Sequence, residues 1–198
     1  GNKLSYYTIN DNNISNKYAE TNQLSCDMMM MEPCFYAKSN SEGDLIIAQN
    51  IANNKSVISL NQIGNVLSSQ SIEVDKIGSL SINDKGNAVV AIRNNNDLKI
   101  KKYIDNNWLD EESPDISGYV SYLSENSVTI ADNNDIFLGL ISNETYPNNV
   151  STGVIRYNNS LGMWENIYDV GNKDGNNIQN INISSGKNGN AIVTWYSN

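Results

Sequence analysis

Residues 83–93 read NDKGNAVVAIR, and this stretch decides the fold class. A polar turn that contains Gly86 leads directly into the apolar run 88–92. The run is rich in β-branched side chains and too short for a buried helix, so it predicts a strand buried on both faces. The turn in front of it indicates a hairpin whose first strand ends near Ile82.

The same sequence of strand, polar turn and apolar strand occurs three more times. Aligned on the Asp or Asn after the turn, the four copies are anchored at Asp44, Asn87, Asp135 and Asn190. The anchors lie 43, 48 and 55 residues apart, which leaves room for about four short strands in each copy. Regular turn signals between apolar runs are typical of an all-β sandwich, barrel or propeller.

We expect an all-β fold, a single β-propeller domain of about four four-stranded blades. The predicted blades are residues 23–73, 74–122, 123–177, and 178–198 together with 1–22. The fourth copy holds sequence for two strands, and two N-terminal segments within 4–19 read as the third and fourth. We therefore expect 4–19 to pair with 190–196 and close the ring, which leaves fewer free sheet edges. The same number of strands would also be found in a fragment of a longer protein, or in one of two chains that share a larger ring.

Two of the copies carry a more specific pattern. Residues 83–93 and 186–196 (GKNGNAIVTWY) resemble the Gly-Asn-Ala-x-x-x-Trp repeats of exported bacterial β-propeller proteins. The copies that have aspartate at the anchor position depart from this pattern. The resemblance implies a propeller fold and a periplasmic, cell-surface or extracellular location, and it implies no ligand.

Composition excludes several classes of function. The net charge is −9, and only Arg93 and Arg156 supply guanidinium groups, so the surface repels phosphate and we expect no nucleic-acid partner. No apolar run approaches the roughly 18 residues of a membrane span. The absence of histidine removes the commonest general base and any histidine-containing zinc site or catalytic triad. We assign no catalytic residue.

The propeller geometry predicts where a ligand would bind. Loops between second and third strands share one face with the loops that cross between blades, whereas the first-to-second-strand turns lie on the other face. We interpret those turns as structural and place the functional site on the loop face. Its candidate ligand contacts are Asn95, Tyr146, Pro147 and Asn149.

The same loop face is acidic. Four carboxylates occur within six residues, and calcium prefers oxygen ligands of this kind. The candidate metal ligands are Asp110, Glu111, Glu112, Asp115 and Asp174. We expect calcium to raise the melting temperature if these loops converge, and the alternative is a solvated acidic surface.

Cys26 and Cys34 are separated by seven residues, four of them methionines. In an exported protein this spacing suits a disulfide. Buried free thiols, and a copper(I) site that includes the methionines, are the alternatives.

The sequence thus favours a non-enzymatic binding or interaction module of the cell envelope or secreted fraction that contacts protein or glycan through the loop face. A glycoside hydrolase that uses a pair of carboxylates is the competing prediction. A structural domain of a larger surface protein is the third.

Overall fold

The structure is a computed structural model, and the residues that it describes are 4–10, 13–19, 35–51, 55–61, 70–94, 97–117, 119–120, 127–142, 152–171 and 178–197. Within these ranges the regular secondary structure consists of β-strands alone, and all strand pairs are antiparallel. The predicted all-β class is therefore confirmed. The same ranges therefore contain no helix able to cross a membrane.

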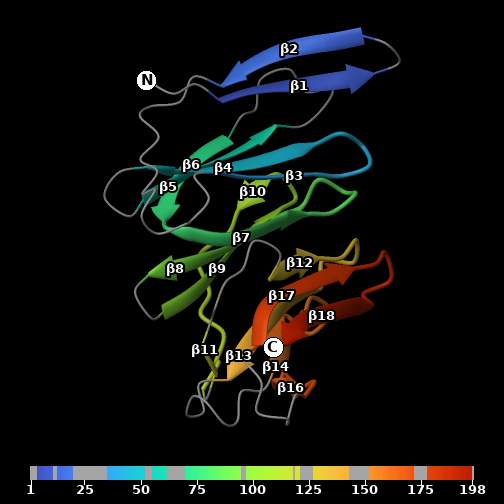
Figure 1. Ribbon diagram of the computed structural model, residues 1–198. Helices are drawn as coiled ribbons and strands as arrows, with labels where there is room; N and C mark the ends of the chain where they lie inside the picture. Colours follow the sequence, from blue (N-terminus) through green and yellow to red (C-terminus); the bar gives the residue numbers. More distant parts are fainter. Residues whose placement is uncertain are drawn as a thin grey trace.

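The strands form separate sheets that follow one another along the chain (Figure 1). The first sheet has the order β3-β4-β5-β6, with β3 Phe35–Ser39, β4 Leu45–Ile51, β5 Lys55–Asn61 and β6 Gln70–Asp75. The second has the order β7-β8-β9-β10, with β7 Ile77–Ile82, β8 Ala88–Asn94, β9 Asp97–Ile104 and β10 Asn107–Trp108.

The third sheet is built around the pair β13 and β14. Its strands are β11 Tyr119–Val120, β12 Val128–Ile130, β13 Ile136–Ser142, β14 Thr152–Asn158, β15 Met163–Trp164 and β16 Tyr168–Asp169. Two further sheets are hairpins, made of β17 Ile178–Ser185 with β18 Ala191–Ser197, and of β1 Leu4–Asn10 with β2 Asn13–Ala19. Although β11 lies inside the predicted second blade, it pairs with β13 of the third sheet.

The apolar runs that the sequence singles out become second strands. Each of β4, β8 and β13 pairs with a neighbour on both sides, and consecutive side chains, which point to opposite faces of the sheet, are buried in all three strands. Burial of both faces explains why these strands show no apolar–polar alternation. Ile46, Val90 and Leu138, one from each strand, are fully buried.

The sheets pack face to face, and β8 contributes to two cores. Because side chains alternate across a strand, Val90 and Ile92 pack against Ile46 and Ile58 of the first sheet. Val89, on the opposite face of β8, packs with residues of the third sheet. Burial of each aliphatic side chain stabilises the fold by about 1.5–3 kcal/mol.

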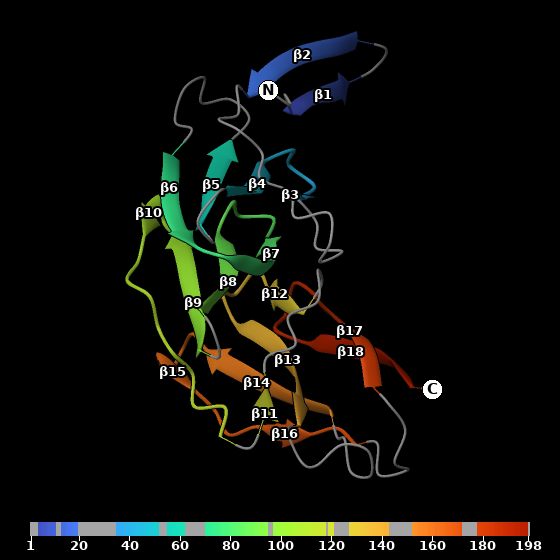
Figure 2. The same cartoon turned by 60° about the vertical axis from the view of Figure 1, so that its left-hand side comes forward.

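The predicted pairing of residues 4–19 with 190–196 is not formed in the structure. The strands β1 and β2 pair with each other, β17 and β18 do likewise, and the two hairpins are separate sheets. Figures 1 and 2 place them at opposite ends of the molecule, with the first and second sheets between them. Stacking of consecutive sheets through their apolar faces carries the two hairpins apart.

Candidate functional site

The four turns between first and second strands share one backbone geometry. The first residue of each turn donates its N–H to the carbonyl oxygen of the fifth, at 2.8 to 3.1 Å. These pairs are Asn40 to Asp44, Asn83 to Asn87, Ala131 to Asp135 and Gly186 to Asn190. The fourth residue has a positive φ, 76° at Gly86 and 66° at Asn134. Glycine and asparagine adopt this conformation most easily, which explains the turn composition.

Side chains connect the first three turns to one another. Asn40 Nδ2 donates to the carbonyl oxygen of Asn83 at 2.8 Å, and Asn83 Nδ2 donates to that of Ala131, also at 2.8 Å. One position further along, the N–H groups of Ser41 and Asp84 donate to the next turn's aspartate, at 3.1 and 3.0 Å. These four bonds, which we call the turn ladder, join residues 43 and 48 positions apart.

The turn ladder brings the first strands together around a cavity of about 570 Å³. We call it the turn-side cavity. The strands β3, β7, β12 and β17 all contribute to its lining, with β18 at one side. Its polar lining residues are Lys38, Ser39, Ser81, Asn83, Asp84, Thr129, Asp132, Asn182, Ser184, Ser185, Lys187 and Thr194, and its aliphatic side chains include Leu80, Ile82, Ile130 and Ile192.

Charged groups lie at the turn end of this cavity. Lys187 Nζ is 3.4 Å from Asp84 Oδ2, which joins the fourth turn to the second. The backbone N–H and the hydroxyl of Ser41, and then the ammonium of Lys187, hold the pKa of Asp84 below its usual range. Asp84 is therefore a carboxylate at neutral pH and accepts hydrogen bonds.

Hydroxyl and amide groups line the walls of the turn-side cavity. The hydroxyls of Thr129 and Ser185 lie 2.9 Å apart across β12 and β17. No aromatic ring is among the lining residues in the described part of the chain. The cavity therefore offers many weak hydrogen-bonding groups, aliphatic contacts and an ion pair at its turn end, an arrangement suited to holding a neutral, hydroxyl-rich molecule.

The predicted calcium ligands contact lysines and a tryptophan. Glu111 Oε2 lies 3.1 Å from Lys99 Nζ. Glu112 pairs with Lys102, and its second oxygen accepts a hydrogen bond from Trp164 Nε1 at 3.1 Å.

The remaining acidic residues of this loop have separate environments. Asp115 accepts bonds from the N–H and hydroxyl of Ser117, at 3.0 and 2.6 Å, and these bonds lower its pKa. Asp110 is exposed. Among the described residues, no three acidic or cysteine side chains are grouped so that they could hold a metal ion. The structure does not bring these carboxylates together, and the calcium site stays a prediction.

Several predicted site residues lie outside the described ranges. They are the ligand contacts Asn95, Tyr146, Pro147 and Asn149, the metal ligand Asp174, and the cysteines Cys26 and Cys34. These assignments remain predictions.

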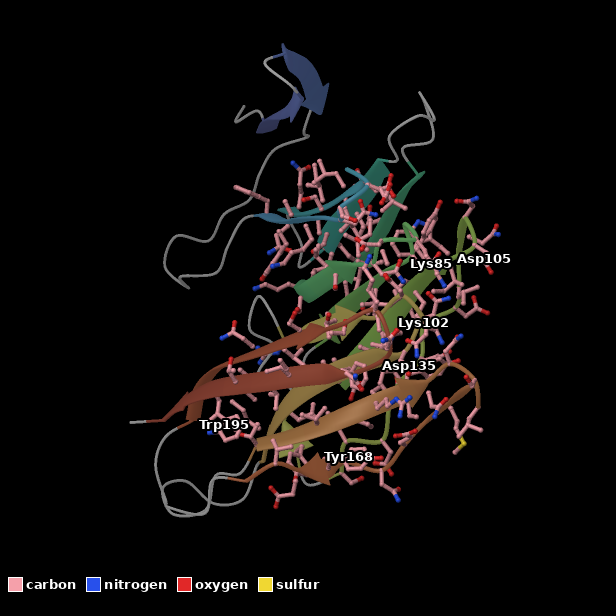
Figure 3. All side chains as sticks on the ribbon, turned by 90° about the vertical axis from the view of Figure 1, so that its right-hand side faces the viewer. Lys85, Lys102, Asp105, Asp135, Tyr168 and Trp195 are labelled. Carbon is pink, nitrogen blue, oxygen red and sulfur yellow. The ribbon has the colours of Figure 1, made fainter. Side chains whose placement is uncertain are left out.

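Two ion pairs, each with one buried member, were missed by sequence reasoning. Asp135, an anchor of the repeat, is almost fully buried and lies 2.5 Å from Arg156 Nη2. Burial raises the pKa of Asp135, but hydrogen bonds from the Asn159 N–H, Arg156 and Asn133 outweigh it and the pKa is lowered. The second pair is Lys102 with Glu112, labelled at Lys102 in Figure 3.

The turn-side cavity lies at the turns that the sequence analysis interpreted as structural. These turns are hydrogen-bonded as such, and they also form one end of the cavity. The available signal was the similar spacing of the anchors, which brings equivalent polar turn residues to one place, and the predicted loop face stays a prediction. Figure 3 shows the side of the molecule that carries Lys85, from the second turn.

No protein-family model and no curated protein matches this chain.

Proposed function

We propose that the chain is a non-enzymatic binding module that holds a glycan in the turn-side cavity. The observation that supports this proposal is a cavity of about 570 Å³ to which the first strands of four consecutive units contribute. This volume lies within the usual range of small-molecule sites and suits one or two sugar rings.

The chemistry of the lining favours a neutral sugar over a charged ligand. Serine, threonine and asparagine side chains both donate and accept hydrogen bonds, as sugar hydroxyls do. Lys187 pairs with Asp84, and the lining also holds one further lysine, Lys38, and one further aspartate, Asp132, so the charges of the lining residues balance. Ile130 and Ile192 supply aliphatic surface for the C–H faces of a ring.

A glycosidase receives less support from the same geometry. Its general acid must stay protonated near neutral pH, which requires a raised pKa. The pKa of Asp84, the cavity carboxylate with the best-defined partners, is lowered instead. The ionised groups at the turn end of the cavity therefore fit a role in ligand binding.

The proposal also concerns how the four units are arranged. The first strands β3, β7, β12 and β17 line one cavity, as innermost strands line the axis of a propeller. We infer that the four units are propeller blades, and the resemblance of residues 83–93 and 186–196 supports the proposal that the protein is exported. Protein contacts through the predicted loop face remain the alternative mode of binding.

A glycan array probed with the purified chain tests the function. Ser184 is exposed and lines the cavity, so Ser184→Trp fills the site without disturbing a core. Ser160 is exposed and lies outside the cavity lining, so Ser160→Trp is the matched control. We expect the wild-type chain and S160W to bind the same glycans and S184W to lose them. Equal binding by both variants, or turnover of chromogenic glycosides by the wild-type chain, would contradict the proposal.

A further inference from the structure

The fourth sheet has an open edge. In the first three sheets the second strand pairs with a third strand, as in β4 with β5, β8 with β9, and β13 with β14. Within the described chain, β18 pairs with β17 alone. An exposed strand edge of this kind is a template for pairing with another strand.

The register shows which backbone groups face this edge. Gly186 donates its N–H to the Asn190 carbonyl oxygen at 2.8 Å, so these two residues form a hydrogen-bonded pair. Hydrogen bonding alternates along an antiparallel pair, which directs the backbone groups of Ile192 and Thr194 toward β17. Those of Val193 therefore face away from β17, toward the open edge.

A mostly apolar cavity of about 400 Å³ lies beside β18, between the third and fourth sheets. Phe137, Val154, Ile183 and Val193 line it, and Arg156 is its one charged lining residue in the described part of the chain. Two of its lining residues are unusually exposed for apolar side chains, Tyr168 at 55% and Val170 at 37%. Figure 3 labels Tyr168 on the rim of the third sheet.

The interface between the second and third sheets shows which strand fills the position that is empty between the third and fourth. Between the second and third sheets, the third strand of the later sheet, β14, places Ile155 over Leu98 and Ile100 of β9, and these three side chains are 1%, 4% and 0% exposed. At the next interface Val154 and Val170 have no third strand over them among the described residues. The cavity and the open edge are thus the two parts of one vacant strand position.

We propose that the β1–β2 hairpin of a second copy of this chain occupies this position, with β1 paired to β18 and β2 outermost. The hairpin is a separate two-stranded sheet, and such a hairpin is at best marginally stable alone. It contributes the two strands by which the fourth sheet differs from the four-stranded first and second sheets. Both β1 and β18 are seven residues long, as is the third strand β5.

The position of the hairpin points to a second copy. The strands β1 and β2 lie beyond the first sheet, at the opposite end of the molecule from β18 (Figures 1 and 2). Each copy therefore carries a donor hairpin at one end and an acceptor edge at the other. Such head-to-tail contacts build a ring if the rotation closes and a filament if it does not.

The first test is the concentration dependence of the mass of the full chain, measured by sedimentation velocity. We expect the wild-type chain to associate. Val170→Lys places a charge in the apolar cavity and should raise the concentration of half-association by about tenfold or more. Leu161 is 66% exposed and lies on the third sheet's β14–β15 turn, so Leu161→Lys is the matched control and should associate like wild type. A wild-type chain that stays monomeric from micromolar to submillimolar concentration overturns the proposal.

A mixing experiment distinguishes a second copy from every other occupant. Tyr7→Pro in the middle of β1 disables the donor, because proline removes a strand N–H, and V170K disables the acceptor. Each variant alone should be monomeric with a wild-type-like circular dichroism spectrum. Their mixture should form a 1:1 dimer, since one intact donor meets one intact acceptor. A mixture that stays monomeric indicates pairing within one chain or another partner, and overturns the proposal.

Discussion

The side-chain amide of Asn83 donates a hydrogen bond to the carbonyl oxygen of Ala131, 2.8 Å away and 48 residues further along the chain. The side chain of Asn83 is buried, and its oxygen accepts bonds from the N–H groups of Lys85 and Asn87. A single asparagine thus shapes its own turn and ties the second unit to the third.

Replacement of Asn83 by alanine tests the strength of this connection. Asn83→Ala leaves buried backbone groups without partners, and we expect the free energy of unfolding to fall by about 2–3 kcal/mol. Asn107→Ala is the matched control, because Asn107 is exposed and its side chain bonds only the nearby carbonyl of Asp105. Urea denaturation measures both. Equal losses would mean that the turn ladder contributes nothing specific.

The Asp135–Arg156 pair makes stability depend on pH. The pKa of Asp135 is lowered in the folded chain from its ordinary value of 3.8. The stabilisation is therefore present above about pH 4 and is lost as the pH falls through the folded-state pKa. Asp135→Asn removes the charge and should reduce the free energy of unfolding by about 2–3 kcal/mol at pH 7, since Arg156 loses its buried partner.

Between pH 7 and an acidic pH well below 4, this difference between D135N and the wild-type chain should shrink, because the wild-type Asp135 becomes protonated as the pH falls through its lowered folded-state pKa. Asp110→Asn, at an exposed carboxylate, is the control and should change stability little at either pH. A difference for D135N that is the same at both pH values would show that charge is not its cause.

The adjacent residues Glu111 and Glu112 allow a comparison of two matched variants. Lys102 Nζ lies 3.8 Å from the centre of the Tyr157 ring, and its side chain is only 4% exposed. Glu112→Gln leaves this ammonium buried without its counter-ion, and we expect a loss of about 3 kcal/mol. Glu111→Gln affects the more exposed pair with Lys99 and should leave the midpoint of urea denaturation nearly unchanged. The reverse order of effects would contradict the burial of Lys102.

Gly139 tests the packing of the fourth sheet on the third. A β-carbon at this position would overlap Cγ2 of Ile181, on β17. Gly139→Ala should therefore push β17 away from β13 and cost about 1–3 kcal/mol. At Gly186 a β-carbon has its nearest neighbour 4.0 Å away, so Gly186→Ala is the control. Thermal melts that are the same for both variants would mean that β17 is loosely held.

The sequence predicts the strands well because their signal is local. The apolar run 88–92 and the turn before it specify a hairpin with few alternatives, and the structure contains it as β7 and β8. Glycine or asparagine at the positive-φ position identifies the turn in the same way. The all-β class depends on such local signals only.

The predicted pairing of residues 4–19 with 190–196 was wrong because ring closure depends on how each sheet is rotated relative to the next. The predicted ring relied on the 52 residues that separate Asn190 from Asp44 when the chain is taken as a circle, a distance close to the other spacings. Spacing fixes how many strands fit in a unit, whereas packing angles decide which hairpins meet. The Asp135–Arg156 pair was missed for a related reason, since its partners lie 21 residues apart, Asp135 directly before β13 and Arg156 on β14.

The double role of β8 has a consequence for how the protein opens. Since Val89 and Val90 belong to different cores, neither core can come apart without disturbing the same strand. In an array whose units pack mainly on their neighbours, local opening starts at the ends. Amide hydrogen exchange should therefore be slowest in β8 and become progressively faster toward β1 and β18, so that the centre of the array keeps its protons longest.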